Sequence, residues 1–157
     1  MSENPADPAG SGRRFCLVAS RYNRVITDRL VAGARDALLR RGARPEDIDV
    51  VHVPGAWELA AAVRQASRAG YDAIVALGCV VRGETPHFDY ICQGATYALS
   101  RLAITEDTPI AFGLITADTL EQAKDRVGGR HGHKGEEAAV AAFEMCGVFD
   151  QIAGAST

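Results

Sequence analysis

The sequence predicts an α/β domain with a single four-stranded parallel sheet, flanked by helices on both faces. Four short apolar runs alternate along the chain with segments whose apolar residues recur at helical spacing. Strands that alternate with helices pair in parallel through right-handed crossovers. The 157 residues form one domain with a real core. We divide the chain into a Pro- and Gly-rich arm over residues 1–12, expected to be flexible, and one domain over residues 13–157.

The first two strands and the helix between them follow from local signals. Phe15–Ser20 (FCLVAS) is an apolar run with polar flanks, typical of a buried parallel strand. Thr27 and Asp28 are both candidate N-caps for the next helix, and Gly42 is a natural stop. Ile48–Val53 (IDVVHV) is predicted as the second strand.

The middle of the chain contains its most apolar segment. A helix is expected over residues 56–69, after the strand-breaking pair Pro-Gly. Ala73–Val81 (AIVALGCVV) is predicted as the third strand, and it is more apolar than any other stretch. The polar loop 82–86 then leads into a helix over residues 87–104 with a buried apolar stripe.

The last third completes the alternation. The fourth strand is expected over residues 109–116 (PIAFGLIT) and a short helix over residues 119–126. A Gly-rich loop over residues 128–135 precedes a final helix that ends near Met145. Together these elements predict a flavodoxin-like three-layer sandwich, in which ligands bind beyond the carboxyl ends of the strands.

Composition narrows the class of protein. Lys and Arg are scattered and the net charge is −3, which argues against a nucleic-acid ligand. No apolar run approaches the roughly 20 residues that cross a bilayer, and the polar N-terminus lacks the apolar core of a signal peptide, so we expect a cytoplasmic protein without a membrane partner. The four cysteines lie far apart, which favours reduced core thiols over a zinc site.

Polar and aromatic residues gather after the predicted strands. Tyr22 and Trp57 offer flat faces for stacking, and Glu58 offers acceptors for hydroxyl groups, although Trp57 could equally be ordinary packing. The loop 82–86 leads into a helix N-terminus, whose free N–H groups suit an anion. His87 at this entrance is a candidate proton-transfer group or simply a cap.

The remaining charged candidates also have two interpretations each. Glu84 and Thr85 either contact a phosphate or form a solvated turn. Arg126 suits a phosphate through bidentate pairing, but a surface arginine is more often solvated. The basic loop 130–135 offers no convincing third metal ligand beside its two histidines. No nucleotide-binding or nucleophile-elbow motif is present, which argues against a kinase, a dinucleotide enzyme or a hydrolase of familiar type. The residues alone therefore predict only that the protein binds a phosphorylated small molecule, with a heterocycle as one candidate.

Five motifs resemble those of the lumazine synthase family, in the family's order. They are SRYN (20–23), PGAWELA (54–60), GCVVRGETPHFDY (78–90), FGLITADTLEQAKDR (112–126) and HKGEEAA (133–139). The resemblance implies the condensation of 5-amino-6-(D-ribitylamino)uracil with 3,4-dihydroxy-2-butanone 4-phosphate to 6,7-dimethyl-8-ribityllumazine, with release of phosphate and water. This is the penultimate step of riboflavin biosynthesis, and it uses no metal or organic cofactor.

The resemblance also implies roles for individual residues. His87 matches the proton-transfer residue, and Tyr22 matches an aromatic residue that stacks on the pyrimidine. Glu84, Thr85 and Arg126 match the phosphate site. In the family, the residues at the positions of Phe112, Arg126 and Lys134 complete the pocket from the adjacent subunit. The remaining positions match residues that hold or line the heterocycle, namely Ala56, Trp57, Glu58, Cys79, Val80 and Val81.

A shared pocket implies a homo-oligomer built of pentamers, in some members a 60-subunit icosahedral capsid. The resemblance does not decide whether the assembly is a pentamer, a decamer or a closed shell, or whether it encloses a riboflavin synthase. Three positions depart from the common pattern: Tyr22, where Phe or Trp is usual, Ala60, where Pro often occurs, and His133, where Asn is common.

Three alternative functions are considered: a flavin- or lumazine-binding module, a chiefly structural shell protein and a flavodoxin-like electron carrier. The carrier needs a phosphate loop after the first strand, which residues 22–26 do not supply.

Overall fold

The computed structural model describes residue 10 and residues 12–155. Most of the arm expected over residues 1–12 therefore lies outside the described residues. The two arm residues inside them are Gly10, whose N–H donates to the Arg41 carbonyl at 2.9 Å, and Gly12, which has a φ of 82°.

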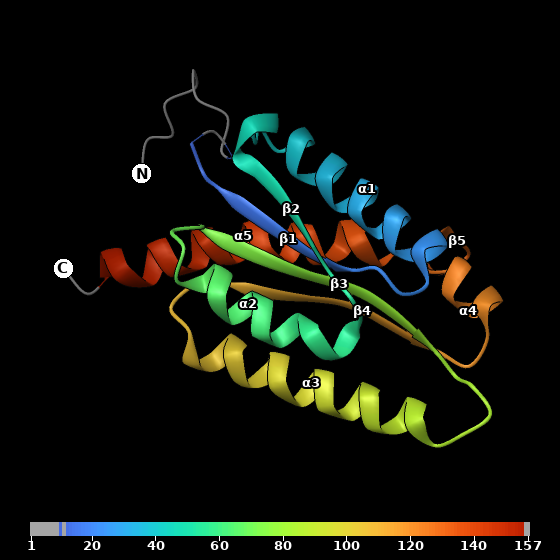
Figure 1. Ribbon diagram of the computed structural model, residues 1–157. Helices are drawn as coiled ribbons and strands as arrows, with labels where there is room; N and C mark the ends of the chain where they lie inside the picture. Colours follow the sequence, from blue (N-terminus) through green and yellow to red (C-terminus); the bar gives the residue numbers. More distant parts are fainter. Residues whose placement is uncertain (1–9, 11, 156–157) are drawn as a thin grey trace.

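Four parallel strands form the central sheet in the order β2-β1-β3-β4 (Figure 1). The strands are β1 (Phe15–Ser20), β2 (Ile48–Val53), β3 (Ala73–Val81) and β4 (Ile110–Ala117). The first three have the bounds predicted from the sequence, and the fourth is shifted by one residue. The predicted α/β fold is confirmed.

Helices cover both faces of the sheet (Figure 1). α1 (Arg24–Arg40) and α5 (Lys134–Ala155) pack on one face, and α2 (Leu59–Ser67) and α3 (His87–Thr105) pack on the other. Between β4 and α5 lie α4 (Leu120–Lys124) and a hairpin of β5 (Val127–Gly129) and β6 (Gly132–His133). Two short 3₁₀ turns, η1 (Pro45–Asp47) and η2 (Ala56–Glu58), precede β2 and α2.

The alternation of side chains along β1 produces two separate cores. Phe15, Leu17 and Ala19 belong to the cluster beneath α1 and α5. Cys16 and Val18 belong to the cluster beneath α2 and α3. Since successive strand residues point to opposite faces, a strand that is apolar at every position must be covered on both faces.

Four expectations for individual elements were wrong. α1 begins at Arg24 rather than at Thr27 or Asp28, because Asn23 adopts a left-handed conformation (φ 58°) that turns the chain directly into the helix. The helix expected over residues 56–69 is split into η2 and α2. The Gly-rich segment forms the β5–β6 hairpin, and α5 runs ten residues beyond Met145 to Ala155.

α5 is apolar along most of its length. Among the described residues it is the one helix whose length and composition would allow it to span a bilayer. No membrane-spanning segment was predicted from the sequence. In the fold, Ala138, Ala139 and Ala142 of α5 are buried in the core beside α1, whereas Met145, Val148 and Ile152 are exposed.

α1 and α5 meet along a seam of small residues. A Cβ atom on Gly135 of α5 would overlap the Leu30 carbonyl oxygen of α1. A Cβ atom on Gly33 of α1 would overlap the imidazole of His133. The His133 Nδ1 accepts the Glu136 backbone N–H at 3.2 Å and so caps the first turn of α5.

Candidate active site

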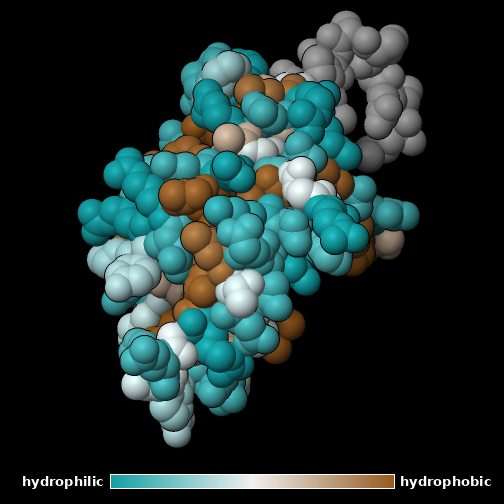
Figure 2. All heavy atoms as spheres, turned by 90° about the vertical axis from the view of Figure 1, so that its right-hand side faces the viewer, coloured by the Kyte–Doolittle hydropathy of each residue, from teal (hydrophilic) through white to brown (hydrophobic). Residues whose placement is uncertain are grey.

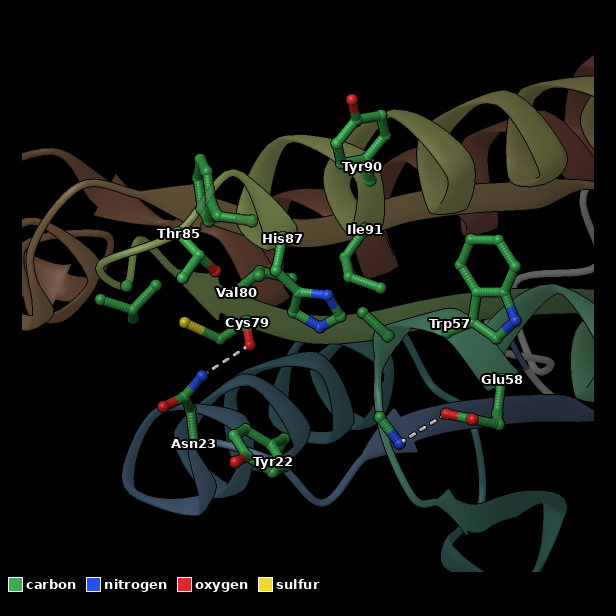
Figure 3. Close-up of a pocket in the computed structure, with 15 residues that line it drawn as sticks. Tyr22, Asn23, Trp57, Glu58, Cys79, Val80, Thr85, His87, Tyr90 and Ile91 are labelled. Carbon is green, nitrogen blue, oxygen red and sulfur yellow. Dashed lines mark hydrogen bonds between the residues drawn. The ribbon is translucent and has the colours of Figure 1, made fainter.

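A cavity of about 760 Å³ opens at the carboxyl end of the sheet, where parallel α/β folds bind ligands. Figure 2 views this end of the molecule and shows apolar residues reaching the surface between polar ones. The cavity is formed by the segments after β1, β2 and β3 and by the first turns of α3. Its lining residues are Tyr22, Asn23, Gly55, Ala56, Trp57, Glu58, Cys79, Val80, Val81, Gly83, Thr85, His87, Phe88, Tyr90 and Ile91 (Figure 3).

Most of the site residues predicted from the sequence share this cavity. They are Tyr22, Ala56, Trp57, Glu58, Cys79, Val80, Val81, Thr85 and His87. Four predicted residues do not line it: Glu84, Phe112, Arg126 and Lys134. The predicted set is therefore divided into one group that the fold brings together and another that lies elsewhere on the chain.

Tyr22, Trp57 and Tyr90 are exposed aromatic residues that border the cavity, and Tyr22 and Trp57 lie on different sides of His87 (Figure 3). Tyr22 is 75% exposed and Trp57 is 61% exposed. The Trp57 ring lies against α3 at Gly94, where an added Cβ would approach the ring carbon Cζ3 to 2.5 Å. Because the rings of Tyr22 and Trp57 are exposed and border the same cavity, both are available to stack on a flat substrate.

The Glu58 side chain is held by its own turn. Its Oε2 accepts the Gly55 backbone N–H at 3.0 Å, which closes a capping interaction around η2 (Figure 3). The carboxylate still has acceptor capacity for a second donor, because each oxygen accepts more than one hydrogen bond. Glu58 can therefore accept from a ligand hydroxyl without releasing its turn.

Asn23 is a cavity residue of the SRYN motif to which the sequence analysis assigned no role. Its Nδ2 donates to the Cys79 carbonyl at 2.9 Å and so connects the ends of β1 and β3 (Figure 3). Its backbone carbonyl accepts the N–H groups of Ile26 and Thr27 at 2.9 and 3.1 Å. An Asn just after an apolar strand is a signal for a left-handed residue, and it could have located both the turn and the true start of α1.

His87 is the first residue of α3, and its imidazole extends into the middle of the cavity (Figure 3). Ile91, one turn later on the same helix, also lines the cavity. Pro86 occupies the N-cap position, and its carbonyl accepts the Asp89 N–H at 2.9 Å. The imidazole is thus free of the capping role that the sequence left open, and it faces the space where a ligand would bind.

Cys79 supplies an inert part of the wall. Burial, followed by the nearby Cys92 thiol, raises the pKa of Cys79 to about 11. The thiol is therefore neutral near pH 7 and is a poor nucleophile. Cys79 therefore offers no thiolate for a covalent adduct near pH 7.

Sequence comparison gives this cavity its chemical context. Residues 12–150 match the family model described as 6,7-dimethyl-8-ribityllumazine synthase. The chain belongs to this family. The enzyme of that name from Aquifex aeolicus (strain VF5) is 49% identical over 142 residues, which cover 90% of this chain and 92% of that protein. Those of Salinibacter ruber (47% over 144 residues, 91% and 92%) and Gemmatimonas aurantiaca (49% over 152 residues, 96% and 93%) are similarly close.

Membership of the lumazine synthase family confirms the activity that the motifs implied. The chain is an enzyme of riboflavin biosynthesis that condenses the ribitylaminouracil with the dihydroxybutanone phosphate and releases phosphate and water. Such an enzyme must hold a flat pyrimidine, a polyhydroxyl chain and a phosphate together. The cavity offers aromatic faces and a carboxylate for the first two.

The third requirement of a lumazine synthase is a cationic group for the phosphate. No Lys or Arg occurs among the residues that line the cavity, and Glu58 is its one acidic residue. Arg82, beside the cavity, is already paired with Asp118 and Asp89. The hydrogen bond with Asp118 is the main cause that raises the pKa of Arg82 above its ordinary value.

The four predicted residues outside the lining occupy exposed or peripheral positions. Glu84 is exposed in the loop between β3 and α3. Phe112 is 51% exposed on the edge strand β4. The Arg126 Nη1 donates to the Gln122 carbonyl at 2.8 Å at the end of α4, and the Lys134 Nζ lies 3.0 Å from Glu137 at the start of α5.

Proposed function

We propose that this cavity is the active site for lumazine synthesis and that a neighbouring copy of the chain completes it. The observation that carries the proposal is the missing cation. The ketone substrate bears a phosphate dianion, and a dianion held away from water needs a fixed positive charge. The lining of the cavity supplies none, whereas Arg126 and Lys134 lie elsewhere on the same chain.

Residues of one chain then bind the pyrimidine substrate. Tyr22 stacks on the ring, the backbone at Ala56 and Trp57 holds its edge, and the exposed Trp57 ring adds a second aromatic contact. The Glu58 carboxylate accepts hydrogen bonds from the ribityl hydroxyls, in the orientation fixed by Gly55. The apolar part of the wall is formed by Cys79, Val80 and Val81.

The phosphate binds where loop 82–86 enters α3. Free N–H groups at a helix N-terminus attract an anion, and the Thr85 hydroxyl at the cavity wall donates one more hydrogen bond. Glu84 contributes through its backbone, since its carboxylate would repel the phosphate. Arg126 of the neighbouring copy supplies the paired guanidinium, and Phe112 and Lys134 of that copy close the pocket.

His87 transfers protons during the reaction. The substrate amine attacks the ketone carbonyl and loses water to form an imine, the C–O bond to phosphate then breaks, and tautomerisation and ring closure release further water. Each step moves a proton at a bound intermediate, and an imidazole that faces the cavity can accept and return it. Holding both substrates in one cavity lowers the entropic part of the barrier.

A subunit-complementation experiment tests the shared site. His87→Ala damages the half-site that contains the cavity, and Arg126→Ala damages the half-site given to the neighbour, so each variant alone is impaired. When the two are unfolded together, mixed equally and reassembled, a site is intact only if both contributing halves are wild type, which restores roughly a quarter of the sites in a cyclic assembly. Co-refolded His87→Ala with wild type provides the dilution control.

The outcomes separate the two arrangements. A site formed by two chains recovers activity above the sum of the separately refolded variants. A site formed within one chain recovers none, because every chain then carries one damaged half. We expect His87→Ala alone to lower kcat by roughly ten- to a thousandfold, and Arg126→Ala to raise KM mainly for the ketone phosphate.

We further propose a cytoplasmic assembly built of pentamers. Exposed Phe112 and the divided site residues support contact between copies. Light scattering distinguishes a pentamer, a decamer and a 60-subunit icosahedral capsid by mass, and co-purification decides whether a riboflavin synthase is enclosed. A monomer that retains full activity would contradict the shared site.

A further inference from the structure

The partly exposed side chain of Arg82 contacts two carboxylates and an aromatic ring. It follows β3 directly, and its backbone N–H donates to the Ala117 carbonyl at 2.9 Å. Its Nε lies 2.7 Å from Asp118 Oδ1, and its Nη1 lies 3.3 Å from Asp89 Oδ1. Its guanidinium carbon lies 4.5 Å from the centre of the Phe88 ring.

These partners come from the end of β4 and from the first turn of α3, and of these two segments the turn of α3 lines the cavity. Asp118 follows the last residue of β4, and Phe88 and Asp89 belong to the first turn of α3, directly after His87. Arg82 itself begins the loop whose Gly83 and Thr85 line the cavity. One side chain therefore fixes the start of this loop, the helix at its end and the neighbouring strand relative to one another.

We propose that Arg82 is a positioning residue for the phosphate subsite, holding loop 83–86 and the first turn of α3 in the geometry that binds the ketone substrate. This inference rests on the proposed function, because it assumes that the loop binds phosphate. Arg82 acts through the loop and does not contact the substrate: it is absent from the cavity lining, and two carboxylates occupy its guanidinium.

The contribution of Arg82 is to geometry more than to stability. The side chains of Arg82, Asp89 and Asp118 are 45%, 48% and 61% exposed, and ion pairs in such positions add little to the stability of a fold. A loop that presents several N–H groups to one anion, however, is sensitive to small displacements, because reacting groups about 1 Å out of place can cost roughly a hundredfold in rate. A substitution should therefore separate binding from folding.

The test compares Arg82→Ala with Arg82→Lys, Asp118→Ala and the double variant Arg82→Ala/Asp118→Ala. We expect Arg82→Ala to raise KM for the ketone phosphate by roughly ten- to a hundredfold, with the pyrimidine KM and Tm nearly unchanged. Arg82→Lys should restore part of the loss, since lysine keeps the positive charge but cannot pair with Asp118 and Asp89 through two separate nitrogen atoms. Arg44→Ala is the matched control: Arg44 Nε lies 2.6 Å from Asp47, beside η1, which precedes β2, whereas the cavity lies beyond the carboxyl ends of the strands.

The Asp118 variants distinguish a positioning residue from a direct ligand. If Arg82 positions the loop, Asp118→Ala also raises this KM, and the double variant is no worse than the more impaired single one. If Arg82 instead binds phosphate itself, removal of Asp118 frees the guanidinium and lowers KM, which would overturn the proposal. An unchanged KM in Arg82→Ala, or equal increases for both substrates, would overturn it too.

Thr85→Ala keeps this inference separate from the proposed function. If the loop binds phosphate, Thr85→Ala raises KM for the ketone phosphate whatever Arg82 does. An effect of Thr85→Ala together with no effect of Arg82→Ala would refute the positioning role alone. No effect of either variant would refute the phosphate site itself.

Discussion

Replacing Gly94 by alanine should move the Trp57 ring while leaving the fold intact. A Cβ at position 94 would lie 2.5 Å from Trp57 Cζ3 and 3.3 Å from Cε3. Because carbon atoms in contact are separated by about 3.5–4.0 Å, the ring must retreat by about 1 Å. Trp57 is 61% exposed, so it can move into solvent without disturbing the core.

Two effects on the free energy of unfolding oppose each other in this variant. Alanine in a helix interior is favoured over glycine by about 1 kcal/mol, and the displaced ring loses part of its packing on α3. We therefore expect a Tm close to that of the wild type. The stacking of an aromatic ring on a substrate is worth about 0.5–1.5 kcal/mol, so KM for the pyrimidine should rise by roughly two- to twelvefold, with the ketone phosphate KM unchanged.

The assay combines tryptophan emission with steady-state kinetics. Trp57 is the one tryptophan of the chain, so its emission reports the ring displacement directly. Gly147→Ala is the control, because Gly147 lies in α5 with no atom within 4 Å of its added Cβ. That variant gains the helical preference without a clash and should keep both KM values. If Gly94→Ala left emission and the pyrimidine KM unaltered, the placement of Trp57 against the substrate would be wrong.

Three further predictions follow from particular contacts. His133→Ala should lower the unfolding free energy by about 1 kcal/mol in chemical denaturation, because it removes the acceptor for Glu136 N–H, whereas His133→Asn should keep most of it. Asn23→Ala should destabilise more than Asn23→Gly: both lose the bond to Cys79, but only alanine is strained at a φ of 58°, at a cost of about 1 kcal/mol or more in thermal unfolding. Burial is the main cause that raises the pKa of Cys16 and of Cys79 from 9.0 to about 11, so unfolded chains lose these protons first. Stability should therefore be complete below about pH 9 and fall as pH rises towards 11, and Cys79→Ala should flatten that decline in pH-dependent denaturation; an unchanged slope would contradict the buried-thiol assignment.

The strands could be predicted closely because their signal is local. Every residue of Phe15–Ser20 is buried, so the apolar run and the strand coincide. The start of α1 could not be found in the same way. Asn23 leads into that helix from a left-handed conformation, and its side chain donates a hydrogen bond to the carbonyl of Cys79, which lies far away in the sequence. The capping preference of Thr27 was real but irrelevant, since Thr27 is buried inside the helix.

The β5–β6 hairpin and the full length of α5 were missed for related reasons. Gly128 and Gly132 both adopt positive φ, so glycines that look like a plain loop instead permit two very short strands. α5 continues beyond the predicted end at Met145, through Gly147 and Asp150, to Ala155. Asp150 is tied to Arg13 by a 2.6 Å ion pair, a partner from the opposite end of the chain that no local pattern indicates.

Most of the candidate site could be predicted because parallel strands end together. Residues after β1, β2 and β3 converge on one cavity whatever the ligand. What spacing in the sequence does not reveal is that Arg126 and Lys134 lie outside that cavity. The roles of these residues remain predictions, and in the proposed function a neighbouring copy of the chain brings them to the substrate.

The contact between Gly33 and His133 restricts how related chains can vary. An imidazole occupies the space where any side chain at position 33 would begin, so the two positions share one fixed volume. A relative with the smaller asparagine at position 133 has room for alanine at position 33, whereas one that keeps histidine does not. Residues 33 and 133 should therefore change as a pair during evolution, and a library randomised at both should yield folded proteins chiefly where a gain in size at one site is matched by a loss at the other.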